Sequence, residues 1–381
     1  MNVYLDNAAT TPMLPAVVDE MLPFMKEHFG NPSSTHSFGR KTKTAIEQAR
    51  RSIAAHLNVA PKTICFTSGG TEADNMALHA GVEQLGCRRI LTCATEHSAV
   101  LKTAQHLGLD PDIEFGLIAL DNRGKVDIQK LDTQLSDGKP TMVSVMHGNN
   151  EVGILQDLTA IGNCCRTHGA FFHTDTVQTM GHYPMDFSAL PVDFAACSAH
   201  KLHGPKGAGF LYVRDGLRIG AHIMGGSQER AMRGGTENLI GIIGLAKALQ
   251  LAMEDQDGHA AHIRALKTEM VKGLSSSVPG IRFNAGSDQP DALYTVLSVN
   301  FPEHAKNGML LFLLDLDGVA CSGGSACSSG STQPSHVLSA LGLHEEGRTS
   351  IRFSFSRLTT MACVQHALKA VESIRGAAIL V

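Results

Sequence analysis

Lys201 follows an apolar, strand-like run in the segment DFAACSAHKLHGPKGAGFLYV, residues 193–213. An ammonium group at the end of a buried strand is costly unless its surroundings use the charge or the amine. One such use is a Schiff base between the lysine amine and an aldehyde. Lys206 is the competing lysine, but its Gly-Pro-Lys-Gly turn favours a solvated side chain. The pattern therefore indicates a chemical role for Lys201.

The segment CFTSGGTEADN, residues 65–75, indicates a place where an anion can bind. A strand-like run ends in Ser-Gly-Gly-Thr, and a helix is predicted to follow with Glu72 and Asp74 in its first turn. Free amides at a helix N-terminus attract anions, and glycines allow close approach. The helix dipole contributes about 0.3–1 kcal/mol to such binding. By itself, however, the segment suits an ordinary capped helix.

Three more segments place polar side chains directly after strand-like runs. FFHTDTVQTMG has Asp175 and Gln178, CATEHSAV has His97, and SVMHGNNEVG has Asn149 and Asn150. In isolation these residues suit a helix cap, a packing histidine and a turn. Ligand-binding residues of a parallel sheet lie at the carboxyl ends of its strands, so all of them are predicted at one sheet edge.

Together these side chains match what pyridoxal phosphate requires. The phosphate of this cofactor sits on a helix N-terminus, its pyridinium nitrogen pairs with a carboxylate such as Asp175, and its aldehyde forms a Schiff base with a lysine. Ser198 and His200 are close neighbours of Lys201 in the chain and can bind the phosphate. The sequence therefore predicts a pyridoxal phosphate enzyme with Lys201 as the Schiff-base lysine.

The elements that must position these residues alternate along the chain. Strand-like runs occur at TICFTS, RILTC, TMVSVM, AFFHTD, VDFAACS and AGFLYV. Segments of helical composition, such as 42–57 and 72–85, separate most of them. Residues 239–253 are predicted to form a buried helix. The alternation is typical of an α/β fold with a largely parallel sheet covered by helices.

The pattern changes beyond about Gly258. A helix is predicted over residues 262–274, and short strands and helices follow to the end of the chain. This indicates a second, smaller α+β domain. Residues 321–335 are rich in glycine and serine and are predicted to form a mobile loop.

Composition narrows the class of protein. The 381 residues are 43% hydrophobic and 18% charged, as in soluble globular proteins. A net charge of −4 provides no basic field for binding nucleic acid or a membrane surface. The first residues, MNVYLDNAATTP, lack the charged and apolar regions of a signal peptide.

The cysteine pattern indicates a reducing compartment. There are nine cysteines and no Cys-x-x-Cys pair, which fits the cytoplasm better than a disulfide framework. The segment Cys164-Cys165-x-x-His168 lacks a second pair of ligands at zinc-like spacing. No metal site is therefore predicted.

Motifs between residues 4 and 357 give the chain a family resemblance. They are YLDNAATTP, GNPSSTHSFGR, TSGGTEADN, TEHSAV, MHGNNEVG, HTDTVQ, SAHKLHGPKGAGFLYV, QERAMRGGTEN, SGGSACSSG and SIRFSFSR. The sequence resembles the cysteine desulfurases of the NifS and IscS type, in the class V aminotransferase family. The resemblance implies the aspartate-aminotransferase-like fold of pyridoxal phosphate enzymes. A large cofactor-binding domain is expected over residues 15–257, and a small domain over residues 1–14 and 258–381.

The resemblance also implies a role for each residue around the cofactor. The implied contacts are Gly70, Thr71, Ser198 and His200 at the phosphate, Thr236 at the phosphate of the neighbouring subunit, His97 stacked on the ring, Asp175 at the ring nitrogen, Gln178 at the ring hydroxyl and Lys201 at the aldehyde. A homodimer with shared active sites is thereby implied.

For the substrate, the resemblance implies that Asn150 and Arg352 bind the carboxylate, with Asn31 nearby. Arginine suits this task because its planar fork binds a carboxylate through two hydrogen bonds. Cys327, in SGGSACSSG, matches the nucleophile of the family and lies in the predicted mobile loop. Cys321 in the same loop follows a strand-like run and suits a buried structural role.

The implied activity is conversion of L-cysteine to L-alanine, with the sulfur held as a persulfide on Cys327. The sulfur then passes to an acceptor protein for iron–sulfur clusters, a thio-cofactor or nucleic-acid thiolation, and the sequence leaves the acceptor open. The alternative is a selenocysteine lyase or another aminotransferase-like enzyme that uses pyridoxal phosphate. A cytoplasmic protein is expected, without direct contacts to nucleic acid or membrane.

Overall fold

The computed structural model describes residues 1–323 and 335–376, so Cys327 lies outside the described residues. The strands are β1 Val3–Tyr4, β2 Ile64–Thr67, β3 Arg89–Thr92, β4 Glu114–Leu117, β5 Thr141–Ser144, β6 Phe171–Asp175, β7 Phe194–Ser198, β8 Gly209–Val213, β9 Arg282–Phe283, β10 Val296–Phe301, β11 Val319–Ala320 and β12 Thr349–Ser354. The α-helices are α1 Pro15–Lys26, α2 Ser37–His56, α3 Gly70–Glu83, α4 Ser98–Leu107, α5 Ile128–Leu135, α6 Leu158–Thr167, α7 Leu239–Met253, α8 Gln256–Ser277, α9 Leu310–Leu316, α10 His336–Ala340 and α11 Met361–Gly376.

Seven strands form one large sheet in the order β2-β8-β7-β6-β5-β3-β4. Strands β4, β3, β5, β6 and β7 run parallel to one another, whereas β8 is antiparallel to both β7 and β2. The link between β7 and β8 is too short to hold the helical crossover that a parallel pair needs. The predicted α/β fold with a largely parallel sheet is confirmed.

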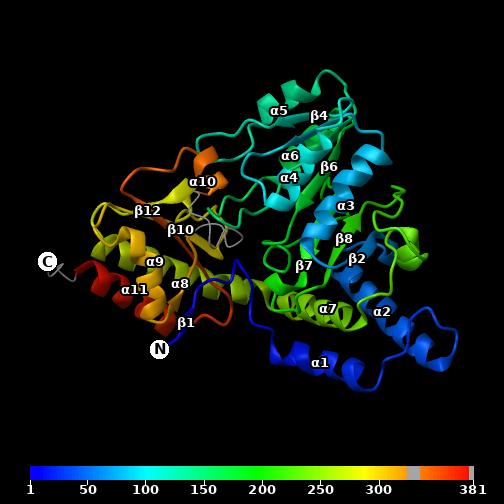
Figure 1. Ribbon diagram of the computed structural model, residues 1–381, viewed down its shortest axis with the longest axis horizontal. Helices are drawn as coiled ribbons and strands as arrows, with labels where there is room; N and C mark the ends of the chain where they lie inside the picture. The colour runs from blue at the N-terminus through cyan, green and yellow to red at the C-terminus, as the bar shows by residue number, and fades with distance from the viewer. Residues whose placement is uncertain (324–334, 377–381) are drawn as a thin grey trace.

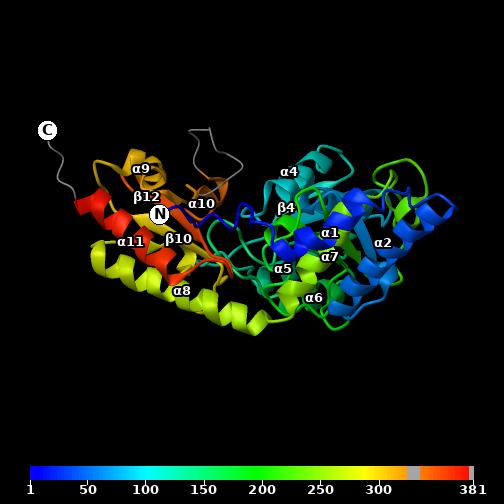
Figure 2. The ribbon, with the colours of Figure 1, turned by 90° about the horizontal axis from the view of Figure 1, so that it is seen from below.

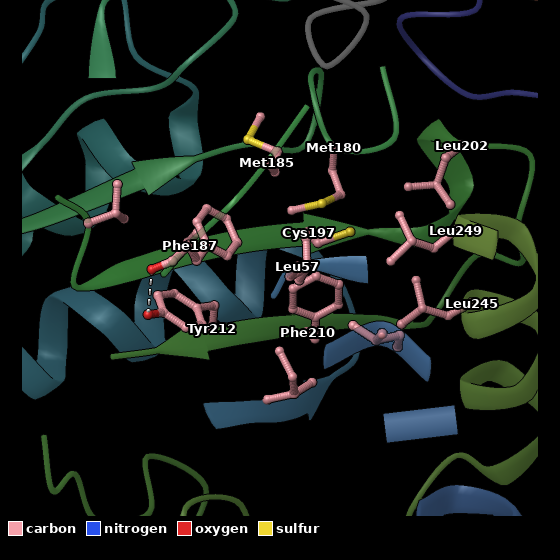
Figure 3. Close-up of a cluster of buried hydrophobic side chains, with 14 of the residues drawn as sticks. Leu57, Met180, Met185, Phe187, Cys197, Leu202, Phe210, Tyr212, Leu245 and Leu249 are labelled. Carbon is pink, nitrogen blue, oxygen red and sulfur yellow. Dashed lines mark hydrogen bonds between the residues drawn. The ribbon is translucent and has the colours of Figure 1, made fainter. Parts of the chain in front are cut away.

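Helices cover both faces of this sheet (Figure 1). Successive strand residues point to opposite faces. Accordingly, Phe66 and Phe210 pack with α1, α2, α5, α6 and α7, while their neighbours Cys65 and Leu211 pack with α3 and α4. Figure 3 shows part of the first cluster, with Phe210 beside side chains of α7. Burying each such large apolar side chain contributes about 1.5–3 kcal/mol to folding.

Helix α7 confirms the predicted buried helix over residues 239–253. Leu245, Ala248 and Leu249 have no exposed surface, and α1 and α2 both pack against this helix. In residues 1–323 and 335–376, no helix is both long enough and apolar enough to cross a membrane.

A second group of elements gathers at one end of the molecule (Figure 2). The antiparallel sheet β12-β10-β9 packs with α8, α9 and α11 around its own hydrophobic cluster. Strand β1 pairs in parallel with β11, so the first residues of the chain join this group. The arrangement agrees with a smaller α+β unit. The domain boundaries at residues 14 and 258 stay predictions, and α8 runs across the second of them.

Two local features differ from the sequence-based expectation. Strand β4 is not predicted because its residues EFGL are half exposed and lack the apolar run that marks the buried strands. Helix α2 begins at Ser37, earlier than the predicted residue 42. It does so because Nδ1 of His36 accepts a hydrogen bond from the Gly39 amide at 3.3 Å and caps the helix.

Lys267 of α8 is a buried amine in the smaller unit. Its Nζ donates to the carbonyl oxygen of Leu293 at 2.9 Å, which is a neutral partner. Burial lowers the pKa of Lys267 from 10.5 to about 7, with Arg264 acting in the same direction and Asp288 opposing. Between these two pH values the unfolded chain binds a proton that the native protein does not. The free energy of unfolding therefore rises with pH across this window, by up to about 1.4 kcal/mol per pH unit.

Lys267→Met is expected to remove this pH dependence, because methionine does not titrate. Chemical denaturation between about pH 7 and 9 measures it. The free energy of unfolding of the wild type, relative to the variant, is expected to rise by about 1 kcal/mol per pH unit. Lys272→Met, at an exposed lysine of the same helix, is the control and is expected to keep the wild-type slope. Equal slopes for wild type and Lys267→Met would contradict a neutral Lys267.

Candidate active site

A cavity of about 600 Å³ lies between the large sheet and the smaller unit. Its walls come from the turn between β2 and α3, the segments after β6 and β7, the N-terminal segment and strand β12. Most of the predicted site residues line it, namely Gly70, Thr71, His97, Asn150, Asp175, Gln178, Ser198, His200, Lys201 and Arg352. The fold thus brings together residues from opposite ends of the chain.

Two predicted residues lie elsewhere in this chain. Asn31 is exposed, and its Oδ1 accepts a hydrogen bond from the amide of Ser33. Thr236 lines a separate depression of about 240 Å³. The roles assigned to Asn31 and Thr236, and that of Cys327 outside the described residues, stay predictions.

His168, in the segment Cys164-Cys165-x-x-His168 where no metal site is predicted, has a carboxylate as its partner. Nε2 of His168 lies 2.7 Å from Oδ1 of Asp132. Potential ligand atoms of Asp132, Cys164 and His168 lie within 4.8 Å of one another, but Asp132 is an exposed residue. The contact with Asp132 accounts for the position of this imidazole.

The anion-binding end of the cavity is formed where β2 meets α3. Gly69 has a φ of 154°, which favours glycine, and Gly70 begins the helix. A Cβ on Gly70 would lie 2.6 Å from Cγ2 of Val177, so a larger residue would displace its neighbour. Oγ of Ser198 lies 3.5 Å from the position of a Cβ on Gly69. Helix amides and this hydroxyl form a compact cradle of the size and polarity that suit a phosphate.

Two histidines of the cavity are held as neutral imidazoles. Nδ1 of His97 accepts a hydrogen bond from the Ala99 amide at 3.2 Å, so the proton of the neutral ring lies on Nε2. Burial lowers the pKa of His97. Burial, together with the charge of Lys201, also lowers the pKa of His200 to about 4. Nδ1 of His200 lies 3.1 Å from Oγ1 of Thr10, which orients this ring.

Asp175 ends strand β6 as a buried carboxyl group. Its Oδ1 accepts a hydrogen bond from the amide of Val177 at 2.8 Å. Burial and the nearby Asp74 raise the pKa of Asp175 to about 7, against the influence of His97. A carboxylate that is this costly to ionise is stabilised by a cation, and a protonated ring nitrogen supplies one.

Asp74 of α3 brings a second carboxyl group to the same place. One oxygen of Asp74, one of Asp175 and one ring nitrogen of His97 lie within 4.8 Å of one another. At that separation two ionised carboxylates repel each other by roughly 3 kcal/mol at an effective dielectric constant of about 20. Burial raises the pKa of Asp74 well above its usual range. From the sequence alone, Asp74 is predicted only as an acid in the first turn of a helix.

Lys201 reaches the cavity from a single 3-10 turn, Ala199–Lys201, that follows β7 directly. Its Nζ donates hydrogen bonds to the carbonyl oxygens of Ala8 at 2.5 Å and Ala9 at 2.8 Å. Nε2 of Gln178 also donates to the Ala8 carbonyl, at 3.0 Å. The N-terminal segment thus supplies hydrogen-bond acceptors to the ammonium group of Lys201. Without such partners, a charge at the end of a buried strand would cost free energy.

Arg352 of β12 is almost completely buried at the other end of the cavity. Its Nη2 donates to Oδ1 of Asp6 at 2.6 Å, and its Nη1 donates to the carbonyl oxygen of Asn150 at 2.8 Å. Among the described residues, Nε of Arg352 has no hydrogen-bond partner. Asp6 therefore orients a guanidinium that still has capacity to bind an anionic ligand.

Three side chains near the cavity were not identified from the sequence. Asp6 lies in the motif YLDNAATTP without an assigned role. Glu96 is fully buried next to His97, and its Oε1 accepts a hydrogen bond from the Met146 amide at 2.7 Å. Glu96 precedes His97 directly, so the position after a strand-like run that indicates His97 also indicates Glu96. His336 lines the cavity and its Nε2 donates to the Glu96 carbonyl, but no local sequence signal marks it.

The residues present fit pyridoxal phosphate. The cradle at Gly70 has the space and the donors for a phosphate, Asp175 is a buried carboxyl group in need of a cation, and Lys201 presents an amine. These features line one cavity, and each matches one group of the cofactor.

The family assignment agrees with this fit. The family described as Aminotransferase class-V matches residues 3–366, nearly the whole chain. The chain therefore belongs to the class-V aminotransferase family, and its cofactor is pyridoxal phosphate.

Similar proteins indicate which type of class-V aminotransferase this chain resembles. The chain is 39% identical over 376 residues to "Cysteine desulfurase IscS" from Clostridium botulinum, covering 98% of this chain and 94% of the relative. A solved structure named "NIFS-LIKE PROTEIN" is 36% identical, with a TM-score of 0.89 over 98% of this chain and 99% of the other. The structure "SspA in complex with cysteine" is 31% identical, with a TM-score of 0.80 over 94% of this chain and all of the other. The family resemblance is confirmed, and with it the aspartate-aminotransferase-like fold.

Proposed function

We propose that this protein is a cysteine desulfurase that uses pyridoxal phosphate and converts L-cysteine to L-alanine. The observation that carries the proposal is the meeting of Lys201, Asp175 and Arg352 in one cavity, in a chain similar to named cysteine desulfurases. The similar protein whose structure holds cysteine supports L-cysteine as the substrate. The relatives favour this function over a selenocysteine lyase or an aminotransferase.

The cofactor would be held by the residues that fit it. Gly70, Thr71 and Ser198 would bind its phosphate, Asp175 its ring nitrogen, and Lys201 its aldehyde. When bound, pyridoxal phosphate supplies an electron sink for the carbon next to the substrate nitrogen.

The side chains of this protein orient the substrate and move its protons. Arg352, held by Asp6, binds the substrate carboxylate, and Asn150 lies beside it. Nζ of Lys201 accepts the proton from the substrate Cα. His97, with its proton on Nε2, takes part in proton transfer on the ring side of the cavity. Since general acid–base catalysis contributes about 10²–10⁴-fold, correct placement of these groups is decisive.

The sulfur step is assigned to Cys327. Its thiolate forms a bond with the sulfur of the substrate while the bond between that sulfur and Cβ breaks. The carbon fragment takes up a proton and leaves as L-alanine. L-cysteine and one enzyme thiol thus become L-alanine and one enzyme persulfide, so the reaction needs no external oxidant.

The finer assignments belong to the same proposal. We infer a homodimer in which Thr236 reaches the phosphate of the neighbouring subunit. The persulfide passes to an acceptor protein, whether for iron–sulfur clusters, a thio-cofactor or nucleic-acid thiolation. A cytoplasmic location is inferred from the cysteine pattern.

Product analysis with the wild-type holoenzyme tests this function. With L-cysteine and a thiol reductant, alanine and sulfide are expected in equal amounts. A selenocysteine lyase would form alanine from L-selenocysteine but not from L-cysteine. An aminotransferase would instead accumulate the amine form of the cofactor, visible as a change in its absorption. Either of these results, without alanine from L-cysteine, would overturn the proposal.

A further inference from the structure

Ser144, His173 and Asp74 form a buried relay beside Asp175. Ser144 ends β5, His173 lies in β6 and Asp74 belongs to α3. Oγ of Ser144 is 2.8 Å from Nδ1 of His173, and Nε2 of His173 is 3.4 Å from Oδ1 of Asp74. At most 1% of the surface of any of the three residues is exposed. The proposed reaction assigns none of them a role.

The two atoms that face each other at the end of this relay need a proton between them. Among the described residues, Nε2 of His173 and Oδ1 of Asp74 have no other hydrogen-bond partner. If neither atom carried a proton, two acceptors would face each other in a dry interior. Unsatisfied buried polar groups are costly, so one proton lies between these atoms.

The surrounding groups decide which of the two residues holds this proton. Three other titratable groups lie close to Asp74. They are Asp175 of β6, and Glu96 and His97 just before α4. Two carboxyl groups this close and this buried disfavour ionisation of both. Burial raises the pKa of Asp74 well above its usual range and lowers the pKa of His173 to about 4. Both directions favour the proton on Asp74.

We propose that Asp74 stays protonated and donates its proton to Nε2 of His173, so that Asp175, and not Asp74, is the anion opposite the ring nitrogen of the cofactor. Asp74 is then a positioning residue, which acts on the cofactor through Asp175. A second anion would compete with Asp175 for the positive charge of the ring. The inference rests on the proposed cofactor but not on the desulfurase reaction.

Infrared difference spectroscopy of the holoenzyme tests the protonation of Asp74. A protonated carboxyl group has a C=O stretching band separate from the bands of a carboxylate. The difference between wild type and Asp74→Asn at neutral pH is expected to contain one protonated-carboxyl band, which shifts in D₂O. Glu96→Gln removes a further buried acid near Asp74 and is expected to leave that band in place. Loss of a carboxylate band in Asp74→Asn would overturn the proposal, since His173 would then be the donor.

Cofactor affinity provides a second test through a conservative replacement. Asp74→Asn keeps an N–H donor for His173, so its dissociation constant for pyridoxal phosphate is expected to stay within about 3-fold of the wild type. Asp74→Leu has no donor and is expected to bind the cofactor at least about 10-fold more weakly. Equal weakening in both variants would show that the charge of Asp74 matters, and would overturn the proposal. Neither test uses substrate, so a failed desulfurase assay remains a separate result.

Discussion

Cys327→Ala is expected to lower alanine formation from L-cysteine by at least about 10³-fold, because removing an enzyme nucleophile costs this much or more. The variant lacks the thiol to which acceptance of the substrate sulfur is assigned. Alanine assayed with a reductant present measures the effect, and the absorption spectrum reports whether the cofactor remains bound. Cofactor binding is expected to be unchanged, since the assigned role of Cys327 involves only the sulfur.

Cys321→Ala is the matched control for this experiment. Cys321 packs against the hydrophobic cluster of the smaller unit, and burial raises its pKa to about 12. Its thiol is therefore not ionised at neutral pH and is a poor nucleophile. The control is expected to keep most of the wild-type alanine formation. Equal activity of Cys327→Ala and wild type would contradict the persulfide step and favour a lyase.

Lys201→Ala is expected to abolish covalent attachment of the cofactor and to lower turnover by at least about 10³-fold. The variant loses both the amine that holds the aldehyde and the acceptor for the Cα proton. Borohydride reduction followed by mass spectrometry measures attachment. In the wild type the added mass is expected on the peptide that contains Lys201.

Lys206→Ala separates the chemistry of Lys201 from the general effect of a cation in the cavity. Lys206 also lines the cavity but its side chain is exposed, in a turn after Lys201. The cofactor is expected to remain covalently attached in this variant. Attachment that survives in Lys201→Ala and disappears in Lys206→Ala would reverse the assignment of the two lysines.

The positions of Lys201, Asp175 and His97 could be predicted because each lies at the end of a strand-like run or a few residues beyond it. The carboxyl ends of neighbouring parallel strands meet at one edge of a sheet, so order along the chain is enough to bring these residues together. The glycines before α3 could be interpreted in the same way, since their need for a close approach is a local property. Strand β4 could not be predicted, because an exposed edge strand needs no apolar pattern.

The contacts of Arg352 and Asp74 could not be predicted from local patterns. Asp6 meets Arg352 only because β1 and β12 belong to the smaller unit, which joins the two ends of the chain. Asp74 meets Asp175 only because α3 packs across the end of β6. No spacing of residues in the sequence predicts either contact.

The sequence by itself therefore determined which reactive groups are available and at which strand ends they lie. An amine, a buried acid, an imidazole and glycine-rich helix amides already specify the cofactor, because each type has a distinct chemical task. Only the tertiary structure decided which groups carry charge. The pKa of Asp74 or Asp175 depends on burial and on distances of a few ångströms between segments that are far apart in the chain. For this reason the ionisation of the site, and the orientation of Arg352 by Asp6, follow from the packing and not from the motifs.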